Sequence, residues 1–109
     1  MLSKQYRLPS RVRLSQSRFY KTSSWSVKIA PNDIDHSRYG FLVRKTVDKR
    51  SVVRNRIRRV FRACIEELQT NISPGNDMLF FLEKSIMTKH QQELRIEIQS
   101  FLAEKKLMV

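Results

Sequence analysis

Cysteine, proline and glycine are scarce in this chain of 109 residues, which holds one, three and two of them respectively. The single cysteine, Cys64, excludes an internal disulfide and any cysteine-rich zinc site, and it fits a reducing compartment. No apolar run approaches the roughly 20 residues that a membrane helix needs. The length suits one compact domain. We therefore expect a single domain spanning residues 1–109, located in the cytoplasm and without membrane contact.

Acidic residues are the other deficit, because ten Asp and Glu stand against 22 Lys and Arg and leave a formal net charge of +12. A fold with this charge repels itself unless a polyanion binds, and a nucleic acid is the expected polyanion. Hydrophobic residues make up 40% of the chain, which excludes a disordered basic tail. The first 32 residues hold no acid at all. We interpret them as a basic arm facing RNA, with an organelle transit peptide as the alternative.

Alternating residues predict two strands in the first half of the chain. Trp25, Val27 and Ile29 alternate with polar residues, as in a strand with one buried face. A turn at residues 31–33 precedes a second predicted strand over residues 38–44, whose apolar face is formed by Tyr39, Phe41 and Val43, with Leu42 opposite. A hairpin is the natural pairing of these two strands.

From Val52 the apolar residues recur at helical spacings and define one stripe, formed by Val53, Ile57, Val60, Phe61, Cys64, Ile65 and Leu68. The predicted helix ends between Asn71 and Gly75, where Pro74 and Gly75 prevent continuation. An uninterrupted apolar run over residues 78–82 then predicts a central strand covered on both faces.

Thr88, followed three residues later by Gln91, resembles a capping box and predicts a terminal helix that packs on the sheet. The predicted order is thus strand, strand, helix, strand, helix. About two dozen N-terminal residues precede it without an assignment.

The predicted helix carries a cationic face. Nine basic residues and one acid, Asp48, lie between Arg44 and Arg62. At about 100° per residue, Asn55, Arg58, Arg59 and Arg62 share the side away from the stripe, while Arg54 borders it and Arg56 projects from the opposite flank. Cations near a helix N-terminus cost about 0.3–1 kcal/mol each. We interpret this arrangement as an RNA-binding site formed by Arg44, Lys45, Arg54, Asn55, Arg56, Arg58, Arg59 and Arg62. A plain solvated basic face is the alternative.

No combination of residues predicts protein catalysis or a metal site. His36 and His90 lie far apart, with no carboxylate or cysteine at metal-ligand spacing. The loop acids, among them Asp48 and Asp77, are better explained by caps and turn hydrogen bonds. Cys64 lies within the apolar stripe and is interpreted as a core residue. We expect no catalytic residue, no metal or cofactor bound by the protein alone, and no small-molecule substrate.

Two segments resemble a known family. They are YGFLVRKTV at residues 39–47 and SVVRNRIRR at residues 51–59, and they closely resemble the bacterial ribonuclease P protein family. The family's hallmark Arg-Asn-Arg stands at residues 54–56. Weaker agreement comes from Tyr6-Arg7-Leu8 and from Gly75-Asn76-Asp77. The resemblance covers most of the chain.

The resemblance implies a fold and a function. The fold is a two-layer α/β (α+β) sandwich with a small mixed sheet, in which the basic helix joins two parallel strands by a left-handed crossover, although such crossovers are generally right-handed. The function is that of a non-catalytic subunit of ribonuclease P, an endoribonuclease whose catalytic RNA, with its Mg²⁺ ions, removes the 5′ leader of precursor tRNA. The Arg-Asn-Arg side is expected to face that RNA, and a separate central cleft to hold the leader. A structural RNA-binding protein, such as a small ribosomal protein, is the competing hypothesis.

The N-terminal part departs from the family pattern. Only sixteen residues separate Leu8 from Trp25, fewer than the resemblance leads us to expect, and Pro9 disfavours a helix through Leu8. The family's cleft uses aromatic residues of an N-terminal helix. Here Phe19 and Tyr20 are the candidates for stacking on the leader.

Overall fold

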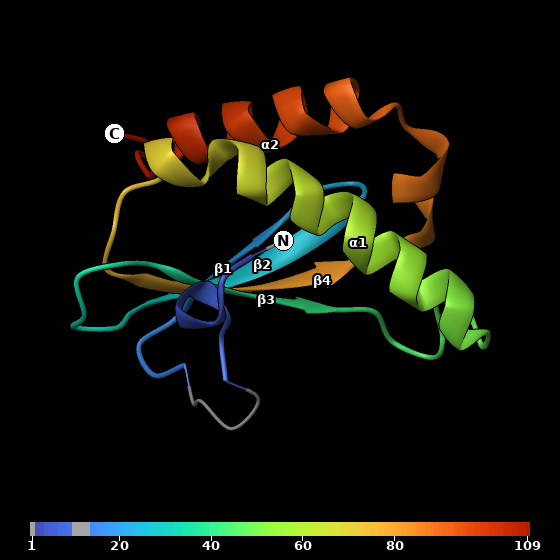
Figure 1. Ribbon diagram of the computed structural model, residues 1–109, viewed down its shortest axis with the longest axis horizontal. Helices are drawn as coiled ribbons and strands as arrows, with labels where there is room; N and C mark the ends of the chain where they lie inside the picture. The colour runs from blue at the N-terminus through green and yellow to red at the C-terminus, as the bar shows by residue number, and fades with distance from the viewer. Residues whose placement is uncertain (1, 10–13) are drawn as a thin grey trace.

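Four strands form one mixed sheet in the order β1-β2-β4-β3, in a computed structural model that describes residues 2–9 and 14–109. The strands are β1 (Arg18–Lys21), β2 (Trp25–Pro31), β3 (Arg38–Leu42) and β4 (Asn76–Leu82). Two helices, α1 (Ser51–Leu68) and α2 (Gln91–Glu104), cover one face of the sheet (Figure 1). Short 3₁₀ helices are η1 (Lys4–Tyr6), η2 (Gln69–Asn71) and η3 (Lys84–Thr88). No helix in the described part of the chain is long and apolar enough to cross a membrane.

The hairpin expected between residues 25–29 and 38–44 is wrong, because β4 lies between β2 and β3. β2 pairs antiparallel with both β1 and β4, and β3 pairs with β4 in parallel. The physical reason lies in β4, whose apolar residues demand the most covered position in the sheet. The prediction that this strand is central is confirmed.

The core lies between the sheet and the two helices. Ile57, Phe61, Cys64 and Ile65 are completely buried, which confirms the apolar stripe of α1. Beneath them Trp25 packs edge-on against the rings of three phenylalanines, Phe61, Phe80 and Phe101. The alternation in β2 and β3 is confirmed as well, since Tyr39 is buried while Leu42 is exposed.

Two elements differ from the sequence-based expectation. Strand β1 falls in the segment left unassigned, because Phe19 and Tyr20 between two cations are too short a pattern to indicate a strand. The capping box is also wrong, because α2 begins at Gln91 with His90 as its N-cap. The Thr88 hydroxyl instead donates to the carbonyl of Ser85 at 2.7 Å within η3.

The N-terminal arm, residues 2–9, lies along the outer edge of β3. The backbone N–H of Leu8 donates to the carbonyl of Tyr39 at 2.9 Å, and Arg7 forms a parallel bridge with the same residue. Gly40 permits this close approach, because a Cβ there would lie 3.0 Å from a methyl of Leu79 and 3.2 Å from one of Leu8. The arm is anchored at its far end by the buried side chain of Leu2.

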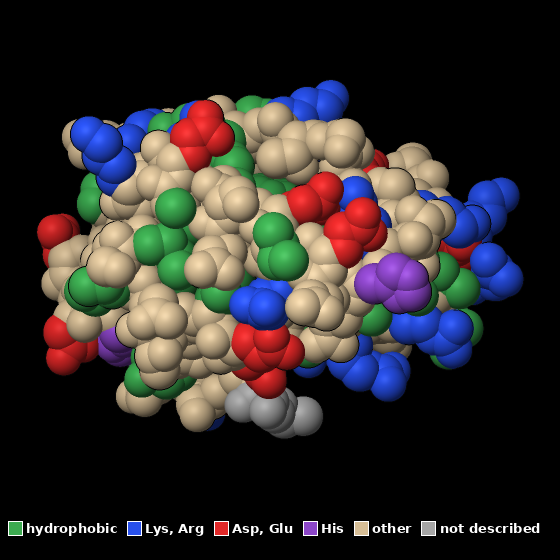
Figure 2. All heavy atoms as spheres, turned by 90° about the horizontal axis from the view of Figure 1, so that it is seen from above, with side chains coloured by type: hydrophobic (Ala, Val, Ile, Leu, Met, Phe, Trp, Pro, Cys, Tyr) green, Lys and Arg blue, Asp and Glu red, His purple; other side chains and the backbone are tan. Residues whose placement is uncertain are grey.

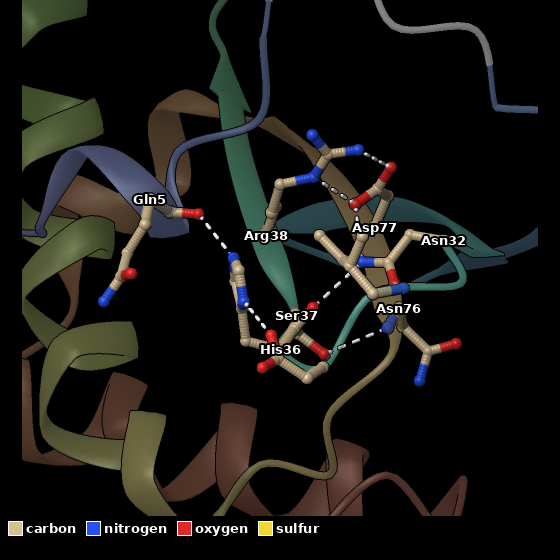
Figure 3. A network of polar contacts seen from close by, with 9 residues as sticks. Gln5, Asn32, His36, Ser37, Arg38, Asn76 and Asp77 are labelled. Atoms are coloured by element: carbon tan, nitrogen blue, oxygen red, sulfur yellow. Dashed lines mark hydrogen bonds and ion pairs between the residues drawn. The ribbon is translucent and has the colours of Figure 1, made fainter.

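A polar network joins the arm to the start of β3 and β4 (Figure 3). The His36 ring contacts the carbonyl of Gln5 at 2.9 Å through Nε2 and the carboxylate of Asp35 at 2.8 Å through Nδ1. The Ser37 hydroxyl donates to the carbonyl of Ser73 and accepts from the backbone N–H of Asn76. These bonds supply partners for the polar groups of a turn-rich corner, and the edge-on contact between the rings of His36 and Tyr6 at 5.3 Å adds packing there.

Candidate nucleic-acid interface

The cationic face of α1 lies at the end of the molecule where that helix begins. Asn55, Arg56 and Arg59 are exposed, while Arg54, Arg58 and Arg62 are half-buried. Lys45 is exposed in the loop that leads into the helix. Seen from above, Lys and Arg side chains gather at this end of the molecule, on the right of Figure 2. Because α1 is one continuous helix, it places Asn55, Arg58, Arg59 and Arg62 on one side, with Arg54 at the border of that side and Arg56 on the opposite flank.

Three arginines form a row along α1, at successive turns of the helix. We call Arg54, Arg58 and Arg62 the arginine row. The pKa of the middle guanidinium is lowered, first by burial and then by the positive charges of its two neighbours. The side chain of Arg58 also donates a hydrogen bond to the amide oxygen of Asn55. The positive charges in this row repel one another, and a bound polyanion would reduce that repulsion.

A buried carboxylate holds the loop that precedes α1. Asp48 accepts hydrogen bonds from the backbone N–H of Arg50 at 2.9 Å and from its Nε at 3.0 Å, and it pairs with Lys84 at 3.0 Å. These contacts, led by the side-chain hydrogen bond from Arg50, hold the pKa of Asp48 well below its usual range. The sequence-based interpretation of this acid as a turn residue is confirmed, and its contacts with two cations are additional.

Arg54 contributes to the same junction. Its Nη1 donates to the carbonyl of Asp48 at 3.0 Å and to that of Lys49 at 2.8 Å. The first arginine of the Arg-Asn-Arg motif therefore fixes the loop that carries the neighbouring cations, in addition to lying on the cationic face. Its position bordering the apolar stripe, predicted from helix geometry, places it within reach of that loop.

The opposite face of the sheet carries a groove of about 790 Å³, which we call the open-face groove. Phe19 is 58% exposed, and the centroid of its ring lies 6.5 Å from that of Phe81. The guanidinium of Arg44 lies over the ring of Phe81, 5.3 Å from its centroid. Lys21, Lys28 and Leu42 also line the groove. Aromatic faces flanked by cations are the usual means of holding single-stranded nucleic acid.

The structure separates the two aromatics proposed from the sequence for stacking. Tyr20 lies on the helix-covered face of the sheet, where its ring contacts that of Phe101 at 5.7 Å. The ammonium of Lys105 lies 4.7 Å from the centroid of Tyr20. Only Phe19 of the pair reaches the open-face groove, because neighbouring residues of a strand point to opposite faces.

Phe81 and Lys28 line the groove and were not predicted from the sequence. Phe81 was part of a run interpreted as covered on both faces, whereas one face of β4 is open to the groove. Lys28 faces the groove because it alternates with Val27 and Ile29, which are buried in the core. The alternation was visible in the sequence, and it indicated the faces of β2 without indicating that one of them forms a groove.

Other reactive groups occupy structural positions. Burial, assisted by the charge of Glu67, raises the pKa of the Cys64 thiol to about 11. Cys64 is buried, and its Sγ lies 3.7 Å from the carbonyl of Gln91. Within residues 2–9 and 14–109, no three His, Cys, Asp or Glu side chains are grouped so as to hold a metal ion.

The sequence is similar to known proteins of one family. The family model for ribonuclease P matches residues 3–106. The chain is 34% identical over 73 residues to the ribonuclease P protein component of a Synechococcus species, a match that covers 67% of this chain and 55% of the relative. It is 40% identical over 62 residues to the corresponding Synechocystis protein, covering 56% and 50%. The chain thus spans about half the length of these relatives.

Solved structures share the fold. The ribonuclease P protein of Staphylococcus aureus superposes with a TM-score of 0.78 at 20% identity, covering 95% of this chain and 98% of that one. The Thermotoga maritima protein gives a TM-score of 0.70 at 19% identity, covering 80% and 82%. Since the family model matches nearly the whole sequence, from residue 3 to residue 106, the chain belongs to the ribonuclease P protein family.

Proposed function

We propose that the protein is the RNA-binding subunit of ribonuclease P, which assists a catalytic RNA in removing the 5′ leader from precursor tRNA. The observation that carries the proposal is the arginine row at the start of α1, within the Arg-Asn-Arg context of the family. Three guanidinium groups repel one another there, and RNA phosphates would offset that repulsion. Arginine also suits the site because its planar guanidinium can donate two parallel hydrogen bonds to two oxygens of one phosphate.

In this proposal the RNA subunit performs the hydrolysis with its Mg²⁺ ions, and the protein contributes positive charge and positioning in the cytoplasm. The arginine row and the flanking Lys45 bind the ribozyme RNA. The positive charge brought near the phosphates reduces the number of Mg²⁺ ions that the RNA needs to approach its substrate.

The open-face groove is the proposed site of the leader. Phe19 presents an exposed ring on which a base can stack, while Arg44, Lys21 and Lys28 lie around it to contact phosphates. The groove lies on the face of the sheet away from α1 and α2, so the leader and the ribozyme RNA would use different surfaces of the protein.

Reconstitution tests the function directly. Purified protein is added to ribonuclease P RNA and precursor tRNA across a Mg²⁺ series, with the RNA alone as the control. We expect cleavage at the mature 5′ end at a Mg²⁺ concentration where the RNA alone is inactive. A Mg²⁺ dependence that the protein leaves unchanged would support the alternative of a structural RNA-binding protein.

The leader site is tested by comparing Phe19→Ala with Ile96→Ala, since both remove a large exposed apolar side chain. Binding of the reconstituted enzyme is measured for precursor tRNA and for mature tRNA. Loss of one base stack should weaken precursor binding by about 1–3 kcal/mol in the Phe19 variant and leave mature tRNA unaffected. Equal losses for both RNAs would place the leader elsewhere.

A further inference from the structure

A second cavity, of about 250 Å³, lies between the N-terminal arm and α1 at the outer edge of β3. We call it the arm cavity. It is distinct from the open-face groove, with which it shares no lining residue. Three structural elements supply its walls, with Leu2, Arg7 and Leu8 from the arm, Gly40 and Phe41 from β3, and Arg62 from α1.

The arm cavity combines apolar walls with two guanidinium groups. Arg62 is half-buried, and its Cζ lies 5.9 Å from the centroid of the Phe41 ring. Arg7 is held from the other side, where its Nε donates to the carbonyl of Leu2 at 3.2 Å. Packing against Phe41 thus positions the half-buried Arg62, and one hydrogen bond orients the exposed Arg7, which lowers the entropy lost when a ligand binds. The described residues that line the cavity include no acid.

The location connects this cavity to the proposed RNA surface. Arg62 is the last member of the arginine row and also lines the cavity, so a strand that binds along the row reaches the cavity one helical turn beyond Arg58. The cavity volume is below the roughly 300–1,000 Å³ of sites that take drug-sized ligands, which suits one nucleotide and no longer strand. Unstacked RNA bases are commonly held on apolar side chains and guanidinium planes.

We infer that the arm cavity takes one unpaired nucleotide of a bound RNA, with the base against Leu8 and Phe41 and the phosphate between Arg7 and Arg62. The inference deepens the proposed function and rests on it, because an RNA strand must lie along α1 to deliver that nucleotide. It gives the N-terminal arm a role of its own, since the arm supplies one wall and one of the two cations.

Nuclear magnetic resonance with a small probe tests the cavity without the ribozyme. The protein is titrated with uridine 5′-monophosphate, with uridine, with inorganic phosphate and with a short oligoglutamate peptide. We expect the monophosphate to shift the Gly40 amide and the methyl signals of Leu2 and Leu8, more strongly than uridine or phosphate. Arg7→Gln and Arg62→Gln should each abolish these shifts, whereas Lys4→Gln, on the same arm but outside the cavity, should retain them.

Three outcomes would overturn the inference. Equal shifts with phosphate alone would show a simple anion site, and equal shifts with the peptide would show a carboxylate site. Shifts confined to the open-face groove would show that the cavity is not used. None of these outcomes depends on ribonuclease P activity, so the cavity and the proposed function can fail separately.

A double-mutant cycle then tests the cavity in the complex with ribonuclease P RNA. Arg7→Gln and Arg62→Gln should each weaken binding by on the order of tenfold. Because both side chains grip one nucleotide, the double variant should lose well less than the product of the two single losses. For Lys4→Gln combined with Arg62→Gln, the loss of affinity should equal the product of the two single losses. If the double variant of Arg7 and Arg62 also lost affinity by the product of its single losses, the two arginines would act on separate parts of the RNA.

Discussion

Arg38 and Asp77 are partners across the parallel strands β3 and β4, and the guanidinium grips the carboxylate with two hydrogen bonds of 2.9 and 2.8 Å. The same carboxylate accepts a third hydrogen bond from the amide of Asn32 at 2.9 Å. This contact joins the turn after β2 to the pair (Figure 3). The hydrogen bonds to Asp77 raise the pKa of Arg38. The pair thus fixes the register where β3 and β4 begin.

Removing the guanidinium should cost much of the stability. Arg38→Ala leaves the Asp77 side chain, which is 5% exposed, with a buried charge and, among the described residues, Asn32 as its one remaining side-chain donor. We expect a loss of about 3–5 kcal/mol in the free energy of unfolding, measured by urea denaturation. Arg18→Ala on the exposed edge strand is the control for loss of one cation. A loss below about 1 kcal/mol would show that the pair does not stabilise the strand pairing.

The Arg38–Asp77 pair also shows why the strand order could not be predicted. The period of two correctly assigned the faces of β2 and β3, because it depends only on neighbouring residues. Which strands pair depends on contacts between residues 39 positions apart, such as Arg38 with Asp77, and no local pattern records them. The predicted hairpin failed for this reason, while the burial of Tyr39 was predicted correctly.

The candidate site also has one part that could be predicted from the sequence and one part that could not. Helix geometry alone placed Asn55, Arg58 and Arg59 on one face, because a helix fixes the angle between its own residues. The open-face groove needs Phe19 from β1 and Phe81 from β4 in one place, and only the assembled sheet brings them there. The sequence could nominate the first ring and could not identify its partner.

Asp48 should make stability depend on pH in the acid range. Its pKa is lowered in the folded protein from the ordinary value of 3.8, first by the side-chain hydrogen bond from Arg50. Because the pKa of Asp48 is lower in the folded protein, its carboxylate stabilises the fold at any pH above the pKa of the unfolded chain. That stabilisation is lost as the pH falls from the pKa of the unfolded chain through the pKa of the folded protein. Asp48→Asn should therefore be less stable than the parent at pH 7, and the difference should narrow below about pH 3.8.

Thermal melts of both proteins across this pH range provide the measurement. Asp33→Asn is the matched control, because it removes an exposed loop carboxylate and keeps a residue type that tolerates the positive φ of 59° there. Parallel curves for the parent and Asp48→Asn across the whole range would contradict the prediction.

Ile57 should matter for stability alone. It is completely buried on the face of α1 opposite the cationic residues. Ile57→Ala should lower the free energy of unfolding by about 2–5 kcal/mol through a core cavity, measured by chemical denaturation. The folded variant should keep the salt dependence of RNA binding. Val52→Ala, at a site 62% exposed on the same helix, should change stability by no more than about 0.5 kcal/mol. A changed salt dependence for the folded Ile57 variant would mean that the core and the RNA surface are coupled.

Arg59 should matter for RNA binding alone, because a solvated helix and an RNA-binding helix respond to its loss in opposite ways. Arg59→Ala removes an exposed cation that lies three residues from both Arg56 and Arg62 on α1, so repulsion between like charges is reduced and the melting temperature should hold or rise slightly. Affinity for ribonuclease P RNA should fall, and the slope of log affinity against log salt should become less steep by about one unit if the arginine neutralises one phosphate.

Lys106→Gln removes the same charge from an exposed position after α2 and should leave both the affinity and the slope nearly unchanged. If Arg59→Ala instead binds as tightly as the parent with an unchanged slope, while Arg7→Gln does not, the principal RNA contact lies on the N-terminal arm and the cationic face of α1 is a solvated surface.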